Sequence, residues 1–159
     1  MILGERQASQ DYFLSLLQTV IGQALHAAGY TLEQRPLQWA GGRYRFVKAL
    51  EDGYTGLIEF QVLVYSDNAW SSDQPSRFNV QLGRSSLRGA EKYDADRFSI
   101  RNLGQLVVRD FGVKILPAED HWWRYHDTDS LAGALAEAGH LIVGYGMPWL
   151  AGELLPPSA

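Results

Sequence analysis

Residues 119–129 hold the side chains of this chain that are best suited to chemistry. Six of them offer oxygen or nitrogen ligands to a metal ion: Glu119, Asp120, His121, His126, Asp127 and Asp129. A hydrolytic metal needs such ligands to converge and to leave one position open for water. The spacing matches neither two histidines four residues apart on a helix nor an Asp-rich calcium loop. We therefore predict no bound metal and no other cofactor, with His121, His126 and Asp127 as the weak candidates, and expect capping and solvated loop roles for this set.

The two histidines could also act as general bases, because a neighbouring carboxylate can orient an imidazole ring. Ser85 and Ser86 are present, but no nucleophile can be assigned, because a catalytic triad is recognised by its geometry. The chain has no cysteine, which excludes disulfides, thiolate zinc sites and a cysteine nucleophile and favours a reducing compartment, the cytoplasm. A small metal-dependent or histidine-based hydrolase centred on residues 119–129 is therefore one of two functional hypotheses.

The aromatic residues of the same segment favour the other hypothesis, a binding function. If the segment is a strand, its side chains alternate between Trp122, Arg124 and His126 on one face and His121, Trp123 and Tyr125 on the other. Only one of the adjacent tryptophans can then enter a single core. The other must lie on the polar face of a sheet near Arg45, at a strand edge, or under a loop or a second subunit. Aromatic residues and arginine dominate interface energetics, so we predict that the outward ring, with Arg124 or Tyr125 beside it, contacts a partner.

The strands that would position this segment centre on a β-hairpin. Residues 43–50 and 54–65 alternate apolar and polar side chains and are joined through a turn containing Gly53, which accepts the positive φ that such turns need. A third strand is predicted over residues 78–82. The apolar face comprises Tyr44, Phe46, Ile58, Phe60, Val62, Val64, Phe78, Val80 and Leu82. The polar face comprises Arg45, Glu59, Gln61, Asn79 and Gln81, and we include Arg45, Glu59 and Gln61 in the predicted binding surface.

Amphipathic helices are predicted at both ends of the chain. Ser9 is the expected N-cap of the first, whose apolar residues recur at spacings of three and four, and Gly29 is its expected end. The last helix is expected to be capped by Asp127 or Thr128 and to stop at Gly146. The predicted fold is α+β: an antiparallel meander of four or five strands with the N-terminal and C-terminal helices packed on one face.

Four further segments complete the prediction. A short edge strand is expected over Leu32–Trp39, because Pro36 is tolerated only at an edge. Phe98–Ile115 mixes helical and strand periodicity, and we favour a strand followed by a short helix. Ser66–Ser76, around Trp70, and Gly83–Asp96 are predicted loops.

Composition limits the remaining possibilities. A chain of 159 residues, 46% hydrophobic and 20% charged, is expected to form a single domain, 1–159, with its core at about 10–152 and frayed ends at 1–8 and 155–159. No stretch predicts a membrane span or a targeting segment. Residues 77–109 carry seven basic and three acidic residues, a net +4, which leaves −8 elsewhere in a chain of net charge −4. This local excess could mark an anionic partner, but we favour solvated loop charges, and the acidic total argues against nucleic acid. The partner that the aromatic segment predicts is a protein or a second copy of the chain, a homodimer.

The order of short motifs along the chain resembles a known family. The motifs are a helix that ends in Ala-Ala-Gly-Tyr, the strand pieces Tyr44-Arg45-Phe46, Ile58–Val62 and Phe78–Gly83, the step Ile100–Gly104, the Trp-rich segment, and the ending Gly146–Leu150. This layout, from about residue 10 to about residue 152, resembles the DUF4304 family of small bacterial proteins, with residues 83–96 as an insertion. The resemblance implies an α+β fold without an assigned activity and supplies no catalytic residue. Because the sequence contains no catalytic motif, we favour a non-enzymatic binding or accessory module.

Overall fold

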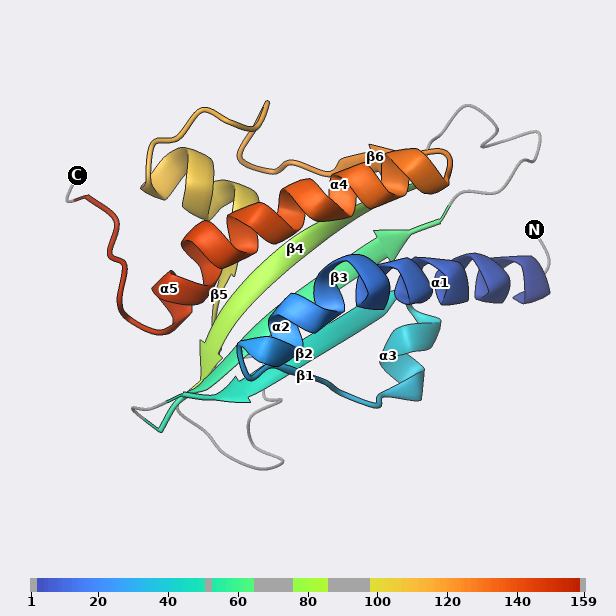
Figure 1. Cartoon of the computed structure of the whole chain (residues 1–159), viewed down its shortest axis with the longest axis horizontal. Coiled ribbons are helices and arrows are strands. Elements are labelled where there is room, and N and C mark those ends of the chain that lie inside the picture. Colours follow the sequence, from blue (N-terminus) through green and yellow to red (C-terminus); the bar gives the residue numbers. More distant parts are fainter. Residues whose placement is uncertain (1–2, 51–52, 65–75, 86–97, 158–159) are drawn as a thin grey trace.

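The protein has an α+β fold built on one antiparallel sheet (Figure 1). The computed structural model describes residues 3–50, 53–64, 76–85 and 98–157, and of residues 3–8, 85, 98 and 99 the backbone alone. Five strands follow one another in meander order: β1 (Thr31–Leu32), β2 (Arg43–Ala49), β3 (Thr55–Leu63), β4 (Ser76–Ser85) and β5 (Phe98–Asn102). A sixth strand, β6 (Trp123–Tyr125), pairs with β4. The predicted fold class is confirmed, with one strand more than expected.

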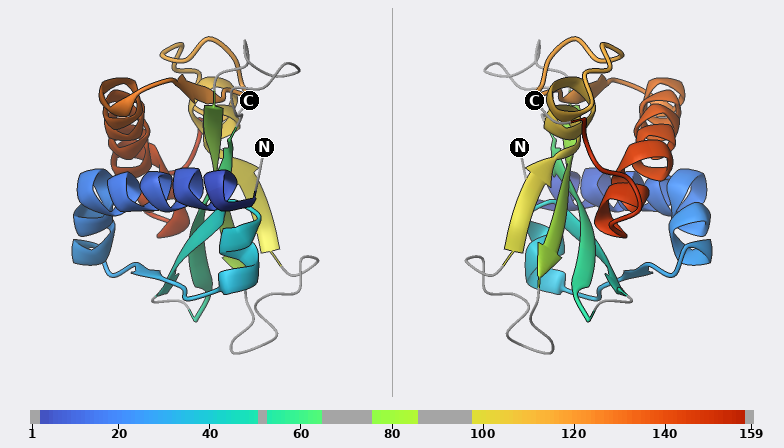
Figure 2. Two further views of the ribbon diagram at one scale, coloured as in Figure 1. Left: turned by 90° about the vertical axis from the view of Figure 1, so that its right-hand side faces the viewer. Right: turned by 90° about the vertical axis from the view of Figure 1, so that its left-hand side faces the viewer.

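Two long helical segments lie on the same side of this sheet (Figure 2). The first consists of α1 (Leu3–Leu17), η1 (Gln18–Gly22) and α2 (Gln23–Ala27), and the second of α4 (Thr128–Leu141), η5 (Ile142–Gly146) and α5 (Met147–Leu150). Two shorter helices, α3 (Pro36–Ala40) and η4 (Gln105–Asp110), lie between strands in the sequence. The long segments pack closely because Gly139 has no side chain: a Cβ there would lie 3.3 Å from Ile21. The two long helical segments thus cover one face of the sheet and leave the opposite face without either of them.

The central hairpin has the predicted strands, turn and faces. Phe46 pairs with Ile58 and Arg45 with Glu59, while Gly53 has the positive φ, +86°, that the turn requires. A second glycine turn leads into the hairpin, because Gly42 has φ +77° and a Cβ there would lie 2.5 Å from the carbonyl oxygen of Val62. The backbone of Gly42 also accepts a hydrogen bond from the Val62 N–H, 2.8 Å long. The alternating apolar and polar side chains of the hairpin therefore lie on opposite faces of the sheet.

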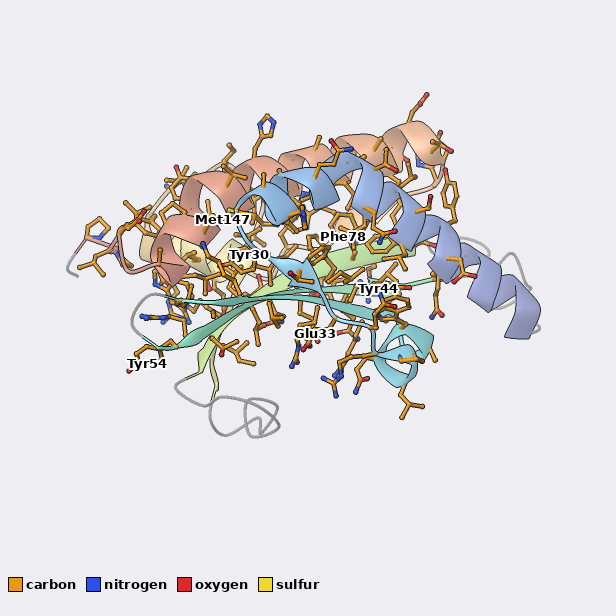
Figure 3. All side chains as sticks on the ribbon, turned by 60° about the horizontal axis from the view of Figure 1, so that its bottom comes forward. Tyr30, Glu33, Tyr44, Tyr54, Phe78 and Met147 are labelled. Carbon is orange, nitrogen blue, oxygen red and sulfur yellow. The ribbon has the colours of Figure 1, made fainter. Side chains whose placement is uncertain are left out.

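The core lies between the sheet and the helices. All predicted apolar-face residues are buried except Val64, which is half-buried and packs against the core. The first helix contributes Phe13, Leu17, Ile21 and Leu25, each four residues apart. A straight α-helix would rotate such a set slowly away from the sheet, and the wider π turn of η1 offsets that drift. Figure 3 shows Phe78 between sheet and helices and Glu33 on the side turned away from them.

Several predicted boundaries were wrong. The first helix begins at Leu3, so Ser9 lies inside it and does not cap it, although Gly29, with φ +95°, does end it. The predicted edge strand is only Thr31–Leu32, because Pro36 instead starts helix α3, a position where its missing N–H costs nothing. Gly146 does not stop the last helical segment, since its φ of −66° is helical and the segment continues to Leu150. Its missing side chain serves close packing on Leu82.

Two other predictions are confirmed, and in each of them a polar side chain caps a helical turn. Phe98–Ile115 forms a strand and then a helical turn, because the Asn102 side chain accepts a 2.8 Å hydrogen bond from the Gly104 N–H and caps that turn. Asp127 caps α4 by accepting from the Ser130 N–H at 2.8 Å. Two loop boundaries were wrong, because β4 runs from Ser76 to Ser85, so Ser76 and Gly83–Ser85 are strand and not loop. The predicted loop around Trp70 and the rest of the 83–96 loop fall on residues 65–75 and 86–97, outside the described residues.

Candidate functional site

The short strand β6 decides where the Trp-rich segment lies. It pairs with the start of β4, with Phe78 opposite Trp123 and Arg77 opposite Arg124. Because residues opposite one another share a face, Trp123 enters the core beside Phe78, their ring centroids 5.5 Å apart and nearly parallel at 14°. Tyr125 is also buried, whereas Arg124 is exposed and Trp122 half-buried. The prediction that the two tryptophans face opposite sides is confirmed.

Trp122 lies in a pocket on the outer face of the sheet, at the edge that β6 forms. The pocket has a volume of about 530 Å³ and is lined by Arg77, Pro117, Ala118, Asp120, His121, Trp122 and Arg124. The guanidinium of Arg77 lies over the Trp122 ring, with its Cζ 4.8 Å from the ring centroid. This is the geometry of a cation–π contact, which orients both side chains. The hollow therefore combines an aromatic wall with charged groups.

Two arginines face each other across the strand pair at this pocket. Arg77 and Arg124 are direct partners in the register, so their Cβ atoms lie about 5 Å apart. Among the described residues, neither side chain forms an ion pair or a hydrogen bond. The Nε atom of Arg77 is buried without a hydrogen-bond partner in that part of the chain. Like charges directly opposite one another destabilise a strand pair, so this arrangement of two arginines is unfavourable without a bound counter-ion.

His121 lines the same pocket but is not arranged for metal binding. Its ring meets the edge of Trp123 with centroids 4.7 Å apart. Burial lowers the pKa of His121, Arg124 lowers it further, and Glu137 and Asp120 act in the opposite direction. The ring is therefore neutral at neutral pH. No group of three His, Asp or Glu residues that could hold a metal ion occurs in the described ranges.

The other predicted metal candidates lie apart from the pocket. His126 and Asp127 are both exposed and form a 3.4 Å contact with each other at the start of α4. The Asp127 carboxylate is engaged by Ser130, and these hydrogen bonds lower the pKa of Asp127. Asp127 therefore caps a helix, and capping was one of the two roles, beside a solvated loop position, that we expected for this segment. Neither residue lines the hollow around Trp122.

The remaining predicted binding residues form a separate polar cluster on the same sheet face. Arg45 and Glu59 pair at 3.2 Å, with side chains only 18% and 14% exposed, and Gln61 lies beside them on β3. From strand spacing and rise, Arg45 lies roughly 17 Å from Arg77. The structure therefore places all predicted outward residues on one face but not in one site. Arg45 and Glu59 neutralise each other, whereas Arg77 and Arg124 have no ion-pair partner among the described residues.

Sequence reasoning missed Arg77 as a pocket residue. Alternation alone, extended two residues back from Asn79, places Arg77 on the polar face. The sequence does not reveal that Arg77 pairs with Arg124, because Arg124 is 47 residues further along the chain and strand pairing at that distance has no local signal. Pro117 and Ala118 were missed for the same reason. A second hollow of about 350 Å³ lies between the end of the first helix and β1, and it contains none of the predicted site residues.

Comparison with known proteins does not identify the site. Neither the family models nor the curated proteins nor the solved structures contain a match to the chain. The resemblance to the DUF4304 family therefore stays a prediction. Among the helices of the described ranges, none has both the length and the apolar character to cross a membrane.

Proposed function

We propose that the protein is a non-enzymatic binding module that holds a protein partner at the Trp122 pocket. The observation that carries this proposal is the pocket itself: a half-buried tryptophan and two arginines in a concave site outside the core, neither of which forms an ion pair with a described residue. Tryptophan and arginine are the residues most enriched among those that dominate binding energy. A pocket of several hundred Å³ is also of the size that takes a side chain or a small ligand.

The pocket is supported by rigid elements, which favours binding without large rearrangement. Arg77 lies on β4, between β3 and β6, and Trp122 immediately precedes β6. Trp123 anchors the segment from the other side by stacking on Phe78 and donating a 3.3 Å hydrogen bond from Nε1 to Glu137. Side chains held in this way lose little conformational entropy when a partner binds. The polar cluster of Arg45, Glu59 and Gln61 continues the same face beyond the pocket.

A photo-crosslinking experiment tests the proposal. The photoreactive residue p-benzoylphenylalanine replaces Trp122 in one variant and Val143, exposed on the helical side, in a control. We expect a crosslinked protein band from position 122 that is absent from position 143 and that disappears when Arg124→Gln is added. A band of twice the chain mass from the purified protein identifies a second copy as the partner. Equal bands from both positions, or none from position 122, would contradict the proposal.

A histidine-based or metal-dependent hydrolase is the second candidate, because His121 lines the pocket together with Asp120. A neutral histidine beside a carboxylate could act as a general base. The described residues of the pocket lining include no serine, threonine or cysteine to serve as a nucleophile, so with these residues alone water would have to attack directly. Elemental analysis of the purified protein decides the metal version: one equivalent of zinc, manganese or iron, lost in His121→Ala, would favour this hypothesis over binding.

A further inference from the structure

We infer that the Trp122 pocket recognises an oxyanion, a carboxylate or a phosphate, carried next to an apolar group of the ligand. This inference rests on the proposed binding function and names the chemistry that the pocket selects. Its basis is the cross-strand pair of Arg77 and Arg124, which brings two positive charges to one side of the hollow. An anion between them would replace a repulsive contact by two attractive ones.

The contact with Trp122 prepares Arg77 for this role. A guanidinium held over an aromatic ring can still donate through the N–H groups that do not point at the ring. Those donors form a planar fork that matches two oxygens of a carboxylate or a phosphate. Arg77 lines the pocket, and its buried Nε–H has no acceptor within the described ranges, so the hydrogen-bonding capacity of this guanidinium is not used up inside the protein. Arg124, exposed and on the neighbouring strand, can approach the same anion from the other side.

The rest of the lining shows what accompanies the anion. Trp122, Pro117 and Ala118 offer apolar surface, and a volume of about 530 Å³ exceeds what a bare inorganic ion would fill. His121 adds no positive charge at neutral pH, so it does not strengthen anion binding there. A ligand group such as an aromatic or aliphatic carboxylate, or a phosphate ester, fits this combination.

Asp120 opposes the anion, and this opposition supplies a sharp test. Its carboxylate also lines the pocket, so the two arginines and Asp120 together carry a net charge of +1. Asp120→Asn should therefore strengthen oxyanion binding, while Arg124→Gln should weaken it. Arg43→Gln is the matched control, because Arg43 is an exposed arginine on the same sheet face that does not line the pocket.

Nuclear magnetic resonance of the indole N–H groups measures binding directly. The Trp122 signal is assigned from Trp122→Phe, and the protein is titrated with phenylacetate, with phenyl phosphate and with the neutral amide phenylacetamide. We expect at least one of the two anions to shift the Trp122 signal saturably at concentrations up to about 10 mM, tenfold above a Kd of 1 mM. Arg124→Gln should raise that Kd about tenfold, which corresponds to about 1.4 kcal/mol, and Arg43→Gln by less than about twofold. The anion that binds more tightly tells a carboxylate from a phosphate ligand.

Three results would overturn the inference: no saturable shift with either anion, an equal shift with phenylacetamide, or an equal loss in Arg43→Gln and Arg124→Gln. Thermal unfolding of each variant shows whether a loss of binding reflects a loss of fold. If the anions fail while the crosslink at position 122 forms, the oxyanion inference is wrong and the binding proposal stands. If the anions bind and no crosslink forms, the pocket takes an anionic small molecule and the protein-partner proposal is wrong.

Discussion

Replacing each of the adjacent tryptophans by alanine tests the assignment of the two faces of β6. Trp123 is only 4% exposed, and its ring stacks on Phe78. Truncating a buried tryptophan costs roughly 3–5 kcal/mol, through lost burial and the cavity left behind. The aromatic stack adds about 0.5–1.5 kcal/mol beyond area burial, which places Trp123→Ala in the upper part of that range. We expect a loss of about 4–5 kcal/mol.

Trp122→Ala should cost much less. The ring is half-buried and its main partner is the Arg77 guanidinium, a contact worth about 0.5–1 kcal/mol at an exposed site. Partial burial of the ring contributes a similar amount. Removing the ring also leaves Arg77 and Arg124 facing each other with less shielding, so the total is about 1–2 kcal/mol. The two variants should therefore differ by at least about 2 kcal/mol.

Urea unfolding followed by far-ultraviolet circular dichroism measures both losses, because this signal does not depend on the indole that is removed. The midpoints are compared at a common slope. For a chain of this size 1 kcal/mol corresponds to about 2–4 °C in Tm, so Trp123→Ala should lower Tm by about 8–20 °C and Trp122→Ala by about 2–8 °C. Equal losses would refute the reasoning and place both rings in the core. A larger loss for Trp122→Ala would mean that β6 pairs with β4 one residue out of register.

Three further predictions follow from the same structure. Phe60→Ala, at a fully buried position, should lower the free energy of unfolding by about 3–5 kcal/mol, and a loss under about 1 kcal/mol in urea unfolding would mean that the sheet faces are reversed. The pKa of His121, lowered mainly by burial and further by Arg124, should rise in Arg124→Gln when followed by proton resonance, and an unchanged pKa would show that the two side chains do not interact. In the native protein the stabilisation that follows from this lowered pKa is present above pH 6.5 and is lost as the pH falls through the folded-state pKa. Burial raises the pKa of three tyrosines to about 12: Tyr30, Tyr44 and Tyr125. The stability that they contribute is therefore present below pH 10 and is lost as the pH rises towards 12. Ultraviolet titration should show these tyrosines ionising only as the protein unfolds, and ionisation of every tyrosine near pH 10 would contradict their burial.

The strands and their faces were largely predictable, because alternation is a property of the backbone itself. Once residues 43–49 and 55–63 form strands, every second side chain must share a face, and the glycine turn sets the register. Asp127 was predictable as a cap for a similar reason, since a carboxylate three residues before a free N–H satisfies it locally. Such features depend on neighbours within a few residues.

The errors arose where local signals allow more than one outcome. Pro36 is compatible with an edge strand and with the first position of a helix, and the packing of α3 against β2 and α1 selected the helix. Gly146 can end a helix or let one approach a sheet, and the closeness of Leu82 selected the second. Ser9 has the chemistry of a cap, but nothing local prevents a helix from starting earlier.

The sequence by itself determined that one ring of the Trp122–Trp123 pair would be buried and the other would not, because adjacent strand residues point to opposite faces. Only the tertiary structure decided which one, since this depends on the pairing of β6 with β4 across 47 residues. The same pairing brings Arg124 opposite Arg77 and closes the pocket around Trp122. Pairing at such a distance is selected by the total burial of the folded chain, and the free energy of that burial belongs to no single segment.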